Sequence, residues 1–151
     1  MESSDDGLFN HVAVTVPRDT LQEPKRTKML EFYSGVFGWE PSPYMMDERH
    51  VVLRAYRRGQ YINLTADDKC SQMRPSDHIG MQVGSFERLQ TIADKARTWK
   101  DQRDPTVKIT GLGCTPSENG PVYSVFIRYL LPLQIEVQYY ATPDEPRYSL
   151  A

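Results

Sequence analysis

Two short segments of this chain resemble each other, and each begins with a histidine. Residues 11–16 read His-Val-Ala-Val-Thr-Val, and residues 78–83 read His-Ile-Gly-Met-Gln-Val. Each segment precedes a helix-like stretch and further strand-like segments, the last of which include residues 62–65 and 135–138. A repeat of this length is typical of one supersecondary unit that is used twice. The sequence therefore predicts two copies of a β-α-β-β-β module.

The spacing of apolar residues predicts the elements of each module. Helical spacing occurs near residues 29–37 and 89–99. Strand-like segments lie at 9–16, 39–46, 50–57, 60–66, 78–83, 106–111, 121–129 and 133–140. The Gly-, Pro- and Ser-containing stretch 111–121 predicts a long loop. We expect one α+β domain, with a first module at 8–66, a linker at 67–77, a second module at 78–140 and a C-terminal tail at 141–151.

The overall composition excludes several classes of protein. The net charge of −2 and the absence of a long basic run argue against nucleic acid as a partner. Apolar runs are too short for a membrane span, and the first residues lack the basic and apolar regions of a signal peptide. The two cysteines have no CxxC spacing, so a disulfide framework is not expected. We expect a cytoplasmic protein with a small-molecule partner and no membrane.

Strand parity places four polar side chains on equivalent faces. Because side chains alternate between the two faces of a strand, His11 and His78 lie opposite purely apolar faces, and so do Asn63 and Glu136. A sheet curved toward the polar faces gathers these four side chains in a cup. A carboxylate facing two imidazoles is costly unless a cation pairs with it. Two histidines and one carboxylate are typical of Fe(II), and Mn, Co, Ni or Zn also fit.

The sequence thus predicts a divalent metal at His11, His78 and Glu136, with Asn63 as a fourth ligand or a neighbour of the ligands. The alternative is that each histidine is a hydrogen-bonded structural residue and that Glu136 is solvated at a sheet edge. No general base is identified; His50 and Tyr123 are candidates. The expected substrate pocket includes Tyr61, Arg54, Phe126 and Arg128, although sheet packing or surface exposure also accounts for these residues.

Four stretches in order resemble the vicinal oxygen chelate superfamily, which includes glyoxalase I, extradiol dioxygenases, methylmalonyl-CoA epimerase, fosfomycin-resistance proteins and bleomycin-binding proteins. They are residues 9–14, 31–39, 77–83 and 135–137. The resemblance implies paired modules in a cupped, barrel-like mixed sheet, the glyoxalase-like fold. It also implies a metal at the positions matching His11, His78 and Glu136, to which substrates bind through two neighbouring oxygens. Members form the cup within one chain or across a dimer, and we expect a homodimer.

Three departures from the family pattern bear on the reaction. Asn63 stands where glyoxalase-type members have Glu or Gln, and Phe126 stands where extradiol dioxygenases tend to have Tyr. Residues 129–132 replace the usual Asp-Pro-x-Gly turn. The first hypothesis is a glyoxalase-type isomerase, epimerase or lyase. An Fe(II)-dependent dioxygenase or other oxygenase is the second, and a non-catalytic antibiotic-type binding protein is the third.

Overall fold

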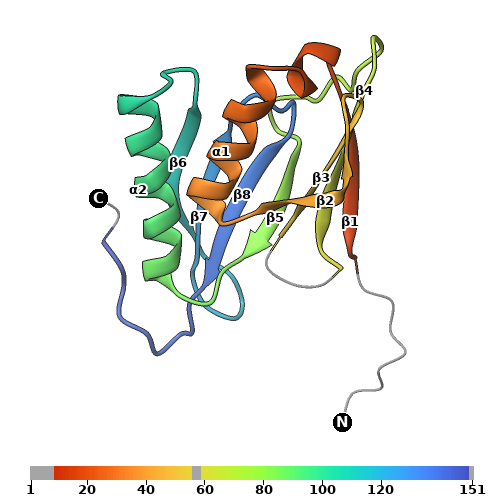
Figure 1. Cartoon of the computed structure of the whole chain (residues 1–151). Coiled ribbons are helices and arrows are strands. Elements are labelled where there is room, and N and C mark those ends of the chain that lie inside the picture. The colour runs from red at the N-terminus through yellow and green to blue at the C-terminus, as the bar shows by residue number, and fades with distance from the viewer. Residues whose placement is uncertain (1–8, 56–58, 150–151) are drawn as a thin grey trace. The chain divides into compact units, whose positions relative to one another are not determined.

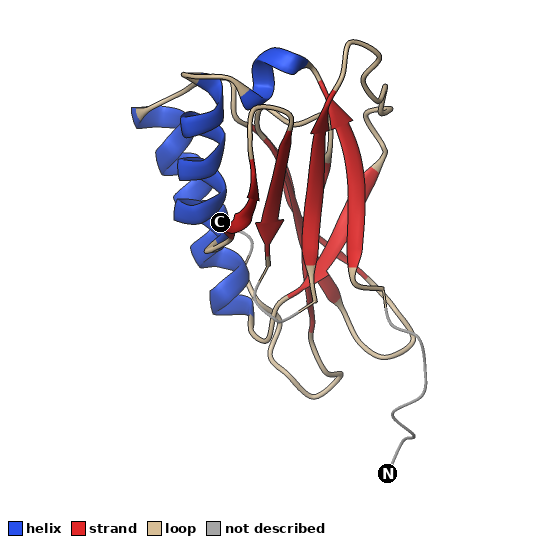
Figure 2. Ribbon diagram, turned by 45° about the vertical axis from the view of Figure 1, so that its right-hand side comes forward, coloured by secondary structure: helices blue, strands red, loops and turns tan. Residues whose placement is uncertain are grey.

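The computed structural model describes residues 9–55 and 59–149. Contacts divide the chain into two compact units: unit 1 extends to Ser34 and continues over Gly38–Ser71, while unit 2 contains Gly35–Phe37 and the residues from Gln72 onward. Each unit holds a four-stranded sheet (Figure 1). Helices and strands account for most of the described residues, and loops join them (Figure 2). The order β-α-β-β-β occurs twice, which confirms the predicted α+β fold.

Unit 1 contains a mixed sheet with the strand order β1-β4-β3-β2. Its elements are β1 (His11–Val16), a 3-10 helix η1 (Arg18–Leu21), α1 (Lys25–Phe37) up to Ser34, β2 (Glu40–Met46), β3 (His50–Arg54) and β4 (Tyr61–Ala66). β1 and β4 are parallel, and the other pairs are antiparallel. A parallel pair needs a long crossover connection, which η1 and α1 supply here. Residues 56–57 of the strand expected at 50–57 lie outside the described residues.

α1 begins earlier than its apolar pattern predicts. The apolar spacing starts at Met29, but the helix starts at Lys25, directly after Pro24. Proline is well tolerated at a helix start, where its missing N–H is not needed. The helix ends at Phe37, and the next residue, Gly38, has a left-handed φ of 76° and an N–H that bonds to the Ser34 carbonyl. Glycine adopts this conformation without strain, so the predicted C-terminus is confirmed.

Unit 2 repeats the arrangement with the strand order β5-β8-β7-β6. Its elements are β5 (His78–Gln82), α2 (Phe86–Gln102), β6 (Lys108–Thr115), β7 (Val122–Arg128) and β8 (Gln134–Tyr140). The Ser85 hydroxyl accepts a hydrogen bond from the Arg88 N–H at 3.1 Å and caps α2. α2 packs on β6, β7 and β8 and buries Leu89, Ile92 and Ala96 (Figure 1). Neither described helix has both the length and the apolar character needed to cross a membrane.

The long loop predicted at 111–121 is wrong in its first half. β6 continues to Thr115, and its register with β7 shifts between Thr110 and Gly113. Gly111, with φ of 41°, lies within this bulge. Glycine inside a strand often marks a bulge rather than the end of a strand. The glycines that suggested a loop therefore bend a continuous strand.

Candidate functional site

The two sheets carry equivalent polar faces. In unit 1, His11 pairs with Tyr61 and Ala13 pairs with Asn63 across the β1–β4 ladder. In unit 2, the β5–β8 ladder pairs His78 with Gln134 and Gly80 with Glu136. Each histidine is therefore two residues along the strand, on the same face, from the cross-strand pair that contains Asn63 in unit 1 or Glu136 in unit 2. The intervening residues of β4 and β8, Ile62, Leu64, Ile135 and Val137, are buried on the opposite faces.

His78 and Glu136 form the contact at the centre of the unit 2 face. The His78 Nε2 atom lies 3.1 Å from Glu136 Oε2, and the Glu136 side chain is only 12% exposed. His78 Nδ1 lies 2.8 Å from the Ser76 carbonyl oxygen. A carbonyl only accepts, so Nδ1 carries the proton and donates. A neutral His78 consequently directs the Nε2 lone pair at a carboxylate, and this contact is favourable only with a proton or a cation between the two atoms.

Gly80 lies beside this contact and places no side chain against it. A Cβ atom at Gly80 would lie 3.6 Å from Gln138 Oε1 and 3.9 Å from Glu136 Oε2. A methyl group at this position would therefore make ordinary van der Waals contact with both side chains. The ring of Phe126, which pairs with Glu136 across β7 and β8, meets the His78 ring edge-on at 5.4 Å. The contact thus has an aromatic ring on one side and a glycine on the other.

His11 is oriented in a similar way in unit 1. Its Nδ1 atom lies 2.7 Å from Asn10 Oδ1, and its ring stacks on Tyr61 with centroids 4.8 Å apart and an interplanar angle of 2°. An amide oxygen also only accepts, so Nδ1 is again the donor and Nε2 remains available. On the same face, Asn63 Oδ1 is buried and has no hydrogen-bond partner among the described residues. A buried, unsatisfied acceptor costs about 1–3 kcal/mol, which a donor or a cation relieves.

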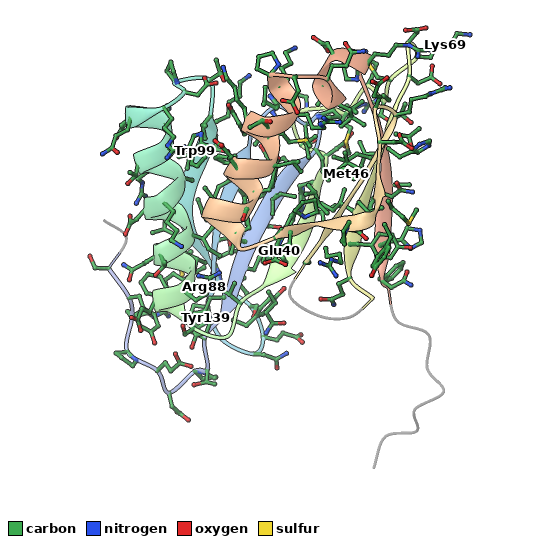
Figure 3. All side chains as sticks on the ribbon, in the orientation of Figure 1. Glu40, Met46, Lys69, Arg88, Trp99 and Tyr139 are labelled. Carbon is green, nitrogen blue, oxygen red and sulfur yellow. The ribbon has the colours of Figure 1, made fainter. Side chains whose placement is uncertain are left out.

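The candidate base His50 and the pocket candidate Arg54 both have acidic partners. His50 Nδ1 lies 3.4 Å from Asp47 Oδ1, which also accepts the backbone N–H groups of Arg49 and His50. These bonds, chiefly the one from Arg49, hold the pKa of Asp47 below its usual value. Arg54 lies 3.8 Å from Glu40, at the start of β2 (Figure 3). Both candidates are on the polar face of unit 1, where His50 pairs with Thr65.

The other candidates lie on both faces of the unit 2 sheet. Tyr123 is buried on the helix side, opposite the face of Glu136, and meets Phe86 at 5.0 Å. Its hydroxyl accepts the N–H of Tyr148 at 3.1 Å. Phe126 and Arg128 share the face of Glu136, and both are half-buried. The predicted metal ligands thus come from both units, with His78 and Glu136 in contact within unit 2.

The sequence analysis did not predict a cluster of hydrogen bonds around the carboxylate of Glu145, in the C-terminal tail. Glu145 accepts hydrogen bonds from the Thr142 N–H at 2.9 Å, the Tyr139 hydroxyl at 2.6 Å and the Tyr148 hydroxyl at 2.8 Å. These three bonds lower the pKa of Glu145 to about 2, and the hydrogen bond to Glu145 raises the pKa of Tyr139. Tyr139 lies at the end of unit 2 where α2 begins (Figure 3). In the sequence, this cluster could have been found only from Tyr139 and Tyr148, and their spacing follows no regular pattern.

The described residues of each unit, taken alone, contain no group of three His, Cys, Asp or Glu side chains that could hold a metal ion. His78 and Glu136 nevertheless have the donor chemistry of a metal site. An imidazole with Nδ1 bonded to a carbonyl oxygen is typical of a histidine that binds a metal through Nε2. His11, with its Nδ1 bonded to Asn10, meets the same criterion. The residues therefore fit a divalent cation in ligand type and in tautomer.

Neither a protein-family model nor a curated protein sequence matches this chain. Solved structures do match over most of its length. One is the fosfomycin resistance protein FosX of Listeria monocytogenes, solved as a complex with Mn(II) and a sulfate ion. It is 17% identical with a TM-score of 0.61, and the match covers 89% of this chain and 90% of that one.

Two further structures agree with this match. FosX of Mesorhizobium loti is 12% identical with a TM-score of 0.58, covering 90% of this chain and 93% of its own. A possible glyoxalase from Bacillus cereus is 19% identical with a TM-score of 0.55, covering 85% and 96%. At such identities the likeness establishes the fold. The chain therefore shares the fold of these FosX and glyoxalase-type structures, which is the glyoxalase-like fold expected from the sequence.

Proposed function

We propose that this protein is a divalent-metal-dependent enzyme that acts on a small molecule bound through two neighbouring oxygens. The metal is held by His11, His78 and Glu136. The observation that carries the proposal is the contact of 3.1 Å between His78 Nε2 and Glu136 Oε2, with the His78 Nδ1 proton committed to Ser76. A cation bound by both atoms removes the conflict between the lone pair and the carboxylate.

Asn63 completes the proposed site. Its buried Oδ1 atom has no donor among the described residues and lies on the polar face that also carries His11. An amide oxygen binds a metal or accepts a hydrogen bond from a substrate hydroxyl, but it cannot take up a proton at neutral pH. The proton acceptor is therefore a different group. His50, on the same face and oriented by Asp47, is the candidate that we propose.

The proposed reaction is an isomerisation, an epimerisation or a lyase reaction of the glyoxalase type. The metal, when bound, polarises substrate oxygens as a Lewis acid. His11, His78 and Glu136 orient it, and His50 exchanges a proton with the substrate. The Mn(II) complex of the FosX neighbour supports a divalent cation in this fold. We further propose that the protein forms a homodimer.

An Fe(II)-dependent oxygenase is the second candidate. Two histidines and one carboxylate leave coordination positions for a substrate and for dioxygen, which favours this reading. Phe126 beside His78 cannot donate a proton, so extradiol cleavage of a catechol is not the proposed chemistry. The identity of the native metal and the requirement for oxygen separate the two candidates.

The test is metal analysis of protein purified without a chelating tag. We expect about one divalent metal per chain, lost in His11→Ala, His78→Ala and Glu136→Ala. The matched control is His50→Ala, which removes an imidazole that is paired with Asp47 and should keep the metal. Iron in wild type, with oxygen-dependent turnover, would favour the oxygenase. If wild type takes up no metal after anaerobic reconstitution, both enzyme proposals fail.

A further inference from the structure

An equivalent arginine faces opposite charges in the two units. Arg54 ends β3 and Arg128 ends β7, each on the polar face of its own sheet. Across the next ladder, Arg54 pairs with Glu40, whereas Arg128 pairs with Lys108. The two units can therefore be compared directly, because the residue opposite the arginine is acidic in unit 1 (Glu40) and basic in unit 2 (Lys108).

The pairing in unit 2 is unfavourable as it stands. Like charges directly opposite on neighbouring strands destabilise a sheet. Arg128 is half-buried, and no hydrogen bond or ion pair to its guanidinium occurs among the described residues. Other half-buried arginines do have acceptors: Arg26 bonds to Glu23 and Arg97 bonds to Asp94. A partly buried cation beside a second cation calls for an anion that the described protein does not supply.

Arg128 also lies close to the proposed metal ligands. Phe126, the preceding same-face residue on β7, pairs with Glu136 and contacts His78. Diagonal neighbours on one sheet face have Cα atoms about 7–8 Å apart, which the long side chain of arginine spans. An anion on Arg128 therefore lies within the length of a small organic molecule from Glu136.

We propose that Arg128 and Lys108 bind an anionic group of the substrate, a carboxylate or a phosphonate, and so make this protein specific for small organic oxyanions. The inference rests on the proposed function for the role of the ligand as a substrate. The binding itself needs only unit 2. Arg128 supplies a planar fork that matches two oxygens of the anion, and Lys108 supplies a second positive charge.

The test is a titration of the ¹⁵N-labelled full chain, as purified and after chelation of metal, with acetate and with methylphosphonate. Acetamide is the neutral control, and the reporters are the Arg128 Nε–H and the Phe126 amide signals. We expect saturable shifts with at least one of the two anions and none with acetamide. The anion that binds more tightly identifies the chemical class. Lys108→Glu, which copies the unit 1 arrangement, should weaken binding by about tenfold or more.

Two variants complete the design. Glu40→Lys makes the reverse change opposite Arg54 and should leave the dissociation constant within about twofold. Arg128→Gln should abolish the shifts while metal content stays at the wild-type level. Equal affinity in wild type and Lys108→Glu would overturn the proposal, as would wild type that binds neither anion. Loss of the metal site with intact anion binding would refute the proposed enzyme but not the anion site.

Discussion

His78 Nε2 lies 3.1 Å from Glu136 Oε2, while the other nitrogen of the same imidazole donates to the Ser76 carbonyl. The backbone just before β5 therefore fixes both the tautomer and the direction of the ring. Glu136, on the neighbouring strand, presents its carboxylate to the nitrogen that does not bond to Ser76. Because β5 starts at His78, an oriented imidazole lies beside the carboxylate of Glu136.

Asn10 should set the metal affinity of His11. Its Oδ1 atom fixes the His11 tautomer at 2.7 Å, whereas His78 depends on a backbone carbonyl that mutation cannot remove. Asn10→Ala should weaken metal binding by about tenfold, the lower end of the usual effect for such partners. Asn10→Asp, which keeps the acceptor, should retain the affinity. Competition with a fluorescent chelator measures both, and equal affinities in the alanine variant and wild type would refute this role.

Glu145 should make stability depend on acid pH. Its pKa of about 2 in the folded protein lies below the value of about 4.3 expected in an unfolded chain. A lowered pKa stabilises the fold fully above the unfolded value, and this contribution is lost as the pH falls from about 4.3 toward 2. Urea unfolding of wild type at pH 7, 4 and 3 should show the decline. Glu145→Gln should be less stable at pH 7 and lose less over this range; parallel curves would contradict the prediction.

Phe86 should hold the C-terminal tail on unit 2. Its ring stacks on Tyr148 with centroids 4.2 Å apart and an interplanar angle of 16°, and it meets Tyr123 edge-on. Phe86→Ala should cost about 3 kcal/mol and release Tyr148. Trypsin should then cleave after Arg147 faster than in wild type, as mass spectrometry of timed digests would show. Tyr140→Ala, which removes an exposed aromatic ring of the same unit, is the control and should leave the rate unchanged.

Gly120 should tolerate no side chain. Its φ is 118°, and a Cβ atom would lie 2.2 Å from the Ala141 carbonyl oxygen. Gly120→Ala should cost at least about 2 kcal/mol through backbone strain and overlap. For a chain of this size that loss lowers the melting temperature by about 4–8 °C. Gly113→Ala adds a methyl group with no atom within 4 Å and should melt close to wild type. Equal melting temperatures for the two variants would show that the turn at Gly120 adapts.

Sequence reasoning predicted the two modules and their strand parity because periodicity and repetition are local signals. The burial of Ile62 and Ile135 and the contact of His78 with Glu136 follow from that parity. The charge opposite each arginine was not predictable, because the bulge in β6 sets which residue pairs with Arg128. The Glu145 cluster was missed for a different reason. Its stability comes from tertiary contacts of Tyr139 and Tyr148, which a short polar tail does not reveal.

Both histidine-bearing strands are edge strands of their own sheets, and each is joined to its sheet by a single parallel ladder. Such strands can open without breaking the antiparallel ladders beside them, and they pair late in folding because their partners are distant in the sequence. The two histidines of the proposed metal site therefore lie on edge strands, whose amides should exchange faster than those of the interior strands β4 and β8, which carry Asn63 and Glu136. A ligand bound at His11 or His78 would slow exchange in β1 or β5 first, so occupancy of the site and closure of each sheet are coupled.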